Sequence, residues 1–128
     1  MKRACLSGAA ICLAGMALLS AAQTGGRGVT WTGWFSDLKC ASARAANGTF
    51  TSTNPECAKT CIKEGAAPAF ISEQAKAVFT LKDSPSVIDQ LGYHVEVQAT
   101  VDDAARTITI RKIKQLGYDG AACQRRKH

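Results

Sequence analysis

The sequence has few of the side chains on which most catalytic centres are built. It has only two histidines: His94 lies on the polar face of an expected strand, and His128 ends the chain. So little histidine argues against a Ser-His-Asp or Cys-His arrangement. No glycine-rich loop with phosphate-binding spacing precedes an expected helix. We therefore expect no catalytic residues and no enzymatic activity.

Long apolar runs are also scarce, and the one present lies near the start of the chain. Residues 9–19 are apolar, Lys2 and Arg3 precede them, and small residues follow at 20–22. A membrane-spanning helix needs about 20 apolar residues, so this run is too short to be one and is typical of a signal peptide. We expect cleavage near Ala22 and a secreted or periplasmic protein without a membrane span.

Acidic residues are fewer than basic ones, with 10 Asp and Glu against 16 Lys and Arg. Two of the basic residues belong to the expected signal peptide, and Arg125, Arg126 and Lys127 belong to the C-terminal tail, so the folded body is nearly neutral. A nucleic-acid-binding face needs basic residues gathered on a structured surface. We therefore expect no nucleic-acid partner. The expected partner is an unidentified ligand or protein of the cell envelope, bound by a monomer.

The rest of the chain is long enough for one small domain. We expect a signal peptide over 1–22, a flexible lead-in over 23–28, a β domain over 29–118 and a basic tail over 119–128. Alternating or short apolar runs predict five strands. These strands are expected over 29–35, 67–71, 78–81, 93–101 and 107–116.

Helix signals are fewer. Asn54 can cap a helix over 55–64 that Gly65 ends, and a short helix is expected over 84–91. Residues 37–53 are expected to form a long loop, with room for a helical turn over 38–46. Closing five short strands into a ring removes exposed edges. The expected fold is therefore mainly β, a five-stranded OB-like barrel, with an open antiparallel α+β sheet as the alternative.

Two strands carry signs of irregularity. Gly33 in the middle of the first expected strand suggests a bend or bulge. In the last strand Ile108 and Ile110 share a face, whereas Ile113 has the opposite parity. We expect a bulge near 111–112 that returns Ile113 to the core.

Four cysteines remain after cleavage, namely Cys40, Cys57, Cys61 and Cys123. An even number in an oxidising compartment favours two disulfides. Cys57 and Cys61 are one helical turn apart, with β-carbons about 5–6 Å apart, and a disulfide needs about 3.5–4.5 Å. Each is therefore expected to pair with Cys40 or with Cys123, and the sequence leaves both combinations open.

Two alternatives use the same cysteines as functional groups. Cys40, Cys57 and Cys61 could present thiolates to zinc or copper, with Asp37 as a fourth ligand, although Asp37 is also suited to capping the segment after the first strand. Cys57 lies in the first turn of the expected helix, where a lowered thiol pKa would suit a thiol oxidoreductase. The favoured interpretation has no cofactor.

Trp34 is the remaining candidate. Its parity is opposite to that of Trp31 and Phe35, so it lies on the outer face of the expected barrel. There it either packs under the helix or the long loop, or offers a surface on which a ligand stacks.

A pattern of motifs resembles one family. The run 32–40, T-G-W-F-S-D-L-K-C, is followed by N-P-E-C-A-K-T-C over 54–61 and by V-Q-A-T-V-D over 97–102. These motifs resemble small exported bacterial proteins of uncharacterised function that have one OB-like domain. The resemblance spans most of 30–116 and implies the fold rather than an activity. Those proteins often have a Cys-Gly pair and a nearby histidine, whereas here Ala41 follows Cys40.

The sequence thus predicts an exported, disulfide-stabilised OB-like module with a binding or structural role in the cell envelope. A cysteine-based zinc or copper protein is the second hypothesis. A thiol oxidoreductase is the third.

Overall fold

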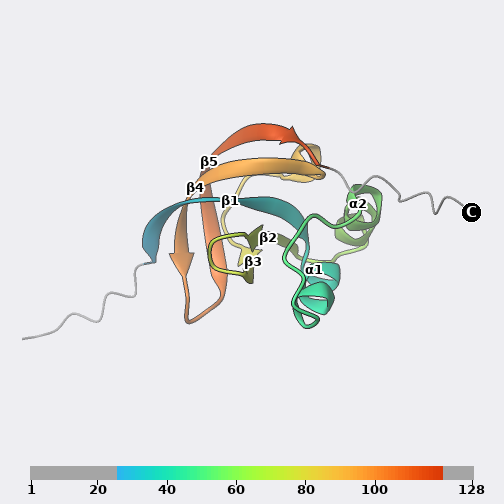
Figure 1. Ribbon diagram of the computed structural model, residues 1–128, viewed down its shortest axis with the longest axis horizontal. Coiled ribbons are helices and arrows are strands. Elements are labelled where there is room, and N and C mark those ends of the chain that lie inside the picture. The colour runs from blue at the N-terminus through green and yellow to red at the C-terminus, as the bar shows by residue number, and fades with distance from the viewer. Residues whose placement is uncertain (1–25, 120–128) are drawn as a thin grey trace, which may run out of the picture.

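The first strand, β1, is the longest-range connector of the fold, because it pairs with two different strands. In this computed structural model, which describes residues 26–119, β1 pairs with β4 through its first part and with β2 through its second. The strand order is β1-β2-β3-β5-β4, and the pairing of β4 with β1 closes the barrel (Figure 1). The strands are β1 (Arg27–Asp37), β2 (Pro68–Ser72), β3 (Ala77–Leu81), β4 (Tyr93–Asp102) and β5 (Thr107–Tyr118).

This architecture confirms the prediction of a mainly β, five-stranded OB-like barrel. The signal peptide, Cys123 and residues 120–128 of the basic tail lie outside the described residues. The expected lead-in was set slightly too long, because β1 already begins at Arg27 and that side chain forms an ion pair with Asp103. No helix in the described part of the chain is long and apolar enough to cross a membrane.

Gly33 marks the point at which β1 changes partner. It is opposite Ser72 of β2 and opposite Val95 of β4. A β-carbon built on Gly33 would lie 1.9 Å from the carbonyl oxygen of Ile71, so a side chain does not fit there. The expected irregularity at Gly33 is thus a close backbone approach at a corner of the barrel.

The alternation along β1 supplies two separate cores. Trp31 and Phe35 point into the barrel, where they pack with the inner residues of the other strands. Trp34 points outward and packs with Ala41 and Ile71 in a smaller cluster under α1. One strand therefore attaches both the barrel core and the outer layer.

The hairpin of β4 and β5 contains the predicted bulge. Ala99 is opposite Ile110 and Gln98 is opposite Lys112, so Arg111 is the extra residue. Ile113 then packs against the barrel core, as expected. A second irregularity lies at Leu116, between the partners of Val95 and His94, and the apolar pattern did not predict it.

The helices differ from the expectation in two places. Most of the region expected to be a loop begins with a full helix, α1 (Leu38–Ala45), and the predicted helix is present as α2 (Pro55–Lys63). The expected helix over 84–91 was wrong in extent, because only the 3-10 turn η1 (Ile88–Gln90) forms there. Both α1 and α2 lie at one end of the barrel, side by side with the end of β1 (Figure 1).

Candidate functional site

Asp37 stands at the junction of β1 and α1. Its backbone is extended, and its Oδ2 accepts a hydrogen bond of 2.9 Å from the backbone N–H of Cys40. This is the N-cap arrangement, in which a short acidic side chain satisfies a free N–H of the first helical turn. Asp37 therefore has the capping role expected of it, and the cap fixes Cys40 close to its carboxylate.

α2 brings a second thiol to the same place. Asn54 begins the helix by accepting hydrogen bonds from the backbone N–H groups of Glu56 and Cys57, as predicted. The chain returns from α2 beside β1, where the backbone N–H of Leu38 donates to the carbonyl of Ala67 at 2.8 Å. The last turn of α2, which carries Cys61, consequently lies against the start of α1.

Asp37, Cys40 and Cys61 form one cluster, and we refer to these three residues as the Asp-Cys-Cys cluster. A carboxylate oxygen of Asp37 and the two sulfur atoms lie within 4.8 Å of one another. Asp37 is 0% exposed, whereas both cysteines are partly accessible. The cluster is therefore buried on its carboxylate side and open to solvent on its thiol side.

One oxygen of this carboxylate has no hydrogen-bond partner. Asp37 Oδ1 is buried and receives no hydrogen bond, and it is the one such side-chain atom found among the described residues. Leaving a buried polar atom unsatisfied costs about 1–3 kcal/mol, and more for a charged group. Such an atom calls for an explanation, and an unmodelled ion is one of the usual ones.

The surroundings of Cys40 keep its thiol protonated. Burial raises the pKa of Cys40 from 9.0 to about 11, and the negative charge of Asp37 and contact with Cys61 raise it further. A thiol in such a place is a poor nucleophile at neutral pH. The same negative surroundings favour a bound cation, which would displace the proton.

The cysteines predicted as ligands are not all together. Cys57 is exposed and lies outside the Asp-Cys-Cys cluster, so the metal site drawn from the sequence was wrong in including it. Cys40, Cys57 and Cys61 are free thiols, and no disulfide joins two of the described cysteines. The prediction of two disulfides involves Cys123, which lies outside the described residues, and it stays a prediction.

Trp34 does not offer a ligand surface. The residue is 6% exposed, its ring stacks on that of His94 at a centroid distance of 4.9 Å, and its Nε1 donates to Asp119 at 3.2 Å. The expectation of an exposed stacking platform is corrected in favour of packing, because α1 and the strand neighbours cover the ring.

His94 belongs to a polar network that the sequence did not predict. Its Nε2 lies 2.7 Å from a carboxylate oxygen of Glu73, to which the hydroxyl of Thr32 also donates. Burial alone would raise the pKa of Glu73, but the hydrogen bonds from Thr32 and His94 outweigh it and hold the pKa below its ordinary value. Turn residue Glu73 and strand residue His94 meet only through the barrel closure, and no local pattern signals that.

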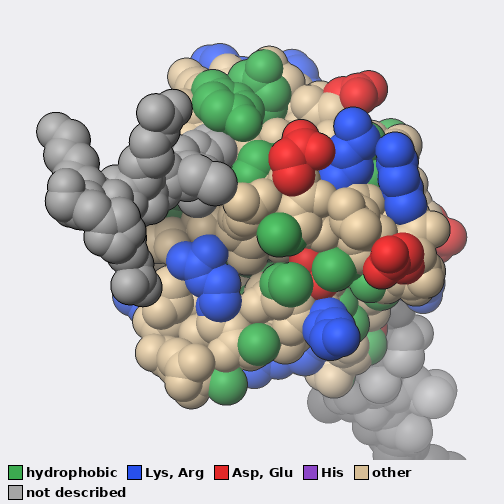
Figure 2. Space-filling model, turned by 90° about the vertical axis from the view of Figure 1, so that its right-hand side faces the viewer, with side chains coloured by type: hydrophobic (Ala, Val, Ile, Leu, Met, Phe, Trp, Pro, Cys, Tyr) green, Lys and Arg blue, Asp and Glu red, His purple; other side chains and the backbone are tan. Residues whose placement is uncertain are grey.

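The charge distribution excludes one kind of site on the helical face. Figure 2 shows that face, and acidic and basic side chains are interspersed over it rather than gathered into one region. This agrees with the nearly neutral body inferred from the sequence.

Fold and geometry together define a small OB-like barrel with a buried carboxylate and two thiols at the junction of its two helices. Comparison of the chain with protein-family models, curated proteins and solved structures gives no significant match.

Proposed function

We propose that this chain is an exported, non-catalytic OB-like module that binds one zinc ion at the Asp-Cys-Cys cluster. The buried, unpartnered Oδ1 of Asp37 beside two free thiols is the observation that carries the proposal. A cation there would supply the missing partner of the carboxylate. The partly accessible thiols leave a route by which the ion and a solvent ligand can enter.

The donor set favours zinc over copper. Two thiolates suit either ion, but zinc also accepts carboxylate oxygen, whereas Cu⁺ prefers sulfur alone. Zinc–sulfur bonds of about 2.3 Å in a tetrahedral site place two sulfurs about 3.8 Å apart. The ligand atoms lie within 4.8 Å of one another, so rotation of the two cysteine side chains would bring them to that spacing.

The disulfide-stabilised module remains the second candidate, and the same proximity of Cys40 and Cys61 supports it. Oxidation of these two thiols would give one of the two pairings open from the sequence. The sulfurs would have to approach to about 2.05 Å, and the carboxylate of Asp37 would stay unpartnered.

Zinc titration of the reduced, metal-free protein tests the proposal. Binding is measured by competition with a chromophoric chelator, using Cys40→Ser and Cys61→Ser against the control Cys57→Ser. We expect one zinc per chain in the wild-type protein and the control, and affinity weakened at least tenfold, on the order of 10- to 100-fold or more, in the two cluster variants.

Two results would contradict the zinc proposal. One is the absence of stoichiometric binding, or an equal loss when Cys57 is replaced. The other is an exported protein whose intact mass lacks two hydrogens and whose peptide map joins Cys40 to Cys61, which would establish the disulfide-stabilised module instead.

A further inference from the structure

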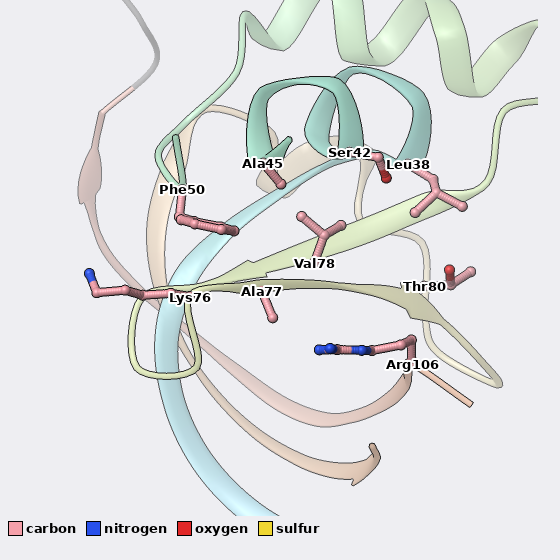
Figure 3. A pocket seen from close by; sticks show the side chains of 9 residues that line it. All are labelled: Leu38, Ser42, Ala45, Phe50, Lys76, Ala77, Val78, Thr80 and Arg106. Atoms are coloured by element: carbon pink, nitrogen blue, oxygen red, sulfur yellow. The ribbon is translucent and has the colours of Figure 1, made fainter. Parts of the chain in front are cut away.

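A second site is suggested by a groove on the other side of α1. The groove has a volume of about 420 Å³ and lies between α1 and the hairpin of β2 and β3. Apolar side chains form its floor, two cationic side chains lie along it, and no acidic residue lines it (Figure 3). The residues used below are Leu38, Ala45, Phe50, Val78, Lys76 and Arg106.

One wall of the groove is an open strand edge. β3 pairs with β5 only at Thr80 and Leu81, and the backbone N–H of Thr80 donates to the carbonyl of Arg106 at 2.9 Å. Alternate residues of a strand direct their backbone groups to the same side. The N–H and C=O of Val78 therefore point to the side of β5, where no described strand pairs with them.

The side chains around this edge differ above and below the strand. Val78 points toward α1, where Leu38 and Ala45 lie, and Ala77 points to the opposite side, where the guanidinium of Arg106 lies (Figure 3). A peptide strand added to β3 would alternate in the same way. One set of its side chains would meet apolar residues of α1, and the other would meet Arg106.

The two cations are available to a ligand. Asp103 forms an ion pair with Arg27, and neither Lys76 nor Arg106 forms an ion pair with any described residue. An acidic occupant would satisfy both. It would have to come from another molecule, because residues 1–25 and 120–128 contain no aspartate or glutamate.

We propose that this groove binds an extended peptide segment of a partner protein, in which apolar and acidic residues alternate, by addition of a strand to β3. Backbone pairing at Val78 would give affinity, and the alternation would give specificity. The proposal is independent of the zinc site, because none of the three residues of the Asp-Cys-Cys cluster lines the groove.

Three short blocked peptides test the proposal on the full-length, metal-free protein by fluorescence anisotropy. The first alternates valine and glutamate, the second has lysine in place of glutamate, and the third is the first with N-methylated backbone amides. We expect only the first to bind measurably at low salt, because the second reverses the charge and the third cannot pair with the strand edge.

Charge reversal locates the binding. Lys76→Glu with Arg106→Glu is expected to weaken binding of the valine–glutamate peptide at least tenfold, on the order of what opposed charges cost at an interface. The control pair is Lys112→Glu with Lys114→Glu, which changes the net charge equally at exposed positions of β5. Circular dichroism checks that both variants fold, and the milder pair Lys76→Gln with Arg106→Gln replaces the first if it does not.

The proposal fails if the lysine peptide binds as well as the glutamate peptide, or if the control pair weakens binding as much as the groove pair. It also fails if the glutamate peptide does not bind while single-stranded oligothymidylate binds and loses affinity with the groove pair. That last result would assign the groove to a nucleic acid.

Discussion

Asp37 and Cys40 share one hydrogen bond, and it satisfies only half of the carboxylate. Asp37 Oδ2 accepts the backbone N–H of Cys40 at 2.9 Å, whereas Oδ1 is buried with no partner. The first contact explains why an acidic residue begins α1. It does not explain why the second oxygen is withheld from both protein and solvent, and a bound cation would.

Asp37→Asn separates these two roles. Asparagine caps a helix as well as aspartate does, so the metal-free variant should keep its free energy of unfolding within about 0.5 kcal/mol or gain stability. The stabilisation by zinc should be lost, because that variant lacks the charged ligand. At a zinc concentration of 100 times Kd the wild-type protein should gain about 2.7 kcal/mol. Thermal unfolding with and without zinc measures both terms.

Asp37→Ala is the matched control, since it removes the cap as well and should cost the metal-free protein about 1 kcal/mol. An Asp37→Asn variant that zinc stabilises as much as the wild-type protein would show that the carboxylate is not a ligand.

The three described cysteines should differ in their rates of alkylation. Alkylating reagents attack the thiolate, and the raised pKa of Cys40, about 11, leaves it mostly protonated at pH 8. We expect exposed Cys57 to react first and Cys40 last, with the Cys40 rate rising about tenfold per pH unit between pH 8 and 10. Asp37→Asn should accelerate Cys40, because the charge of Asp37 contributes to the raised pKa.

Peptide mapping by mass spectrometry after timed alkylation gives the three rates. Added zinc should protect Cys40 and Cys61 and leave Cys57 unchanged. Equal protection of all three cysteines would place Cys57 in the site, against the geometry.

Much of the barrel could be predicted because its signals are local. The two-residue alternation along β4 and the parity of Ile113 depend on neighbours in one strand, and both the strand and the bulge at Arg111 are present. Asn54 and Pro55 likewise mark the start of α2 within a few residues. The region expected to be a loop after Asp37 was harder, because α1 has little apolar periodicity and depends on its cap and on packing under Trp34.

The candidate site could be predicted only in part. Asp37, Cys40 and Cys61 were all candidates, but their choice over Cys57 depends on which face of α2 meets α1, and the sequence holds no signal for that. The pairing of Glu73 with His94 depends on barrel closure in the same way. Residue types therefore indicated the chemistry, and tertiary packing selected the members.

The Glu73 network should make stability depend on pH in the acid range. The pKa of Glu73 is lower in the folded protein than its ordinary value of 4.5, so the carboxylate contributes stability that is present above pH 4.5 and is lost as the pH falls through the folded pKa. Glu73→Gln should be less stable than the wild-type protein at pH 7, and the two should converge in acid. Urea unfolding across this range measures the difference. Glu64→Gln, at the exposed end of α2, is the control, and an equal effect there would contradict the prediction.

Gly33 should tolerate no side chain, in contrast to another glycine of the same strand. A β-carbon at Gly33 would lie 1.9 Å from the carbonyl oxygen of Ile71 and 2.9 Å from the ring of Phe70, whereas one at Gly28 would meet nothing within 4 Å. Gly33→Ala must therefore push β1 and β2 apart at the barrel corner. We expect a loss of at least about 2 kcal/mol in the free energy of unfolding, the scale of overpacking in a core, and a change within about 0.5 kcal/mol for Gly28→Ala. Chemical denaturation of both variants measures the two values. Because β1 ends at Asp37, Gly33→Ala should also weaken zinc binding if the corner positions the Asp-Cys-Cys cluster, and Gly28→Ala should leave it unchanged.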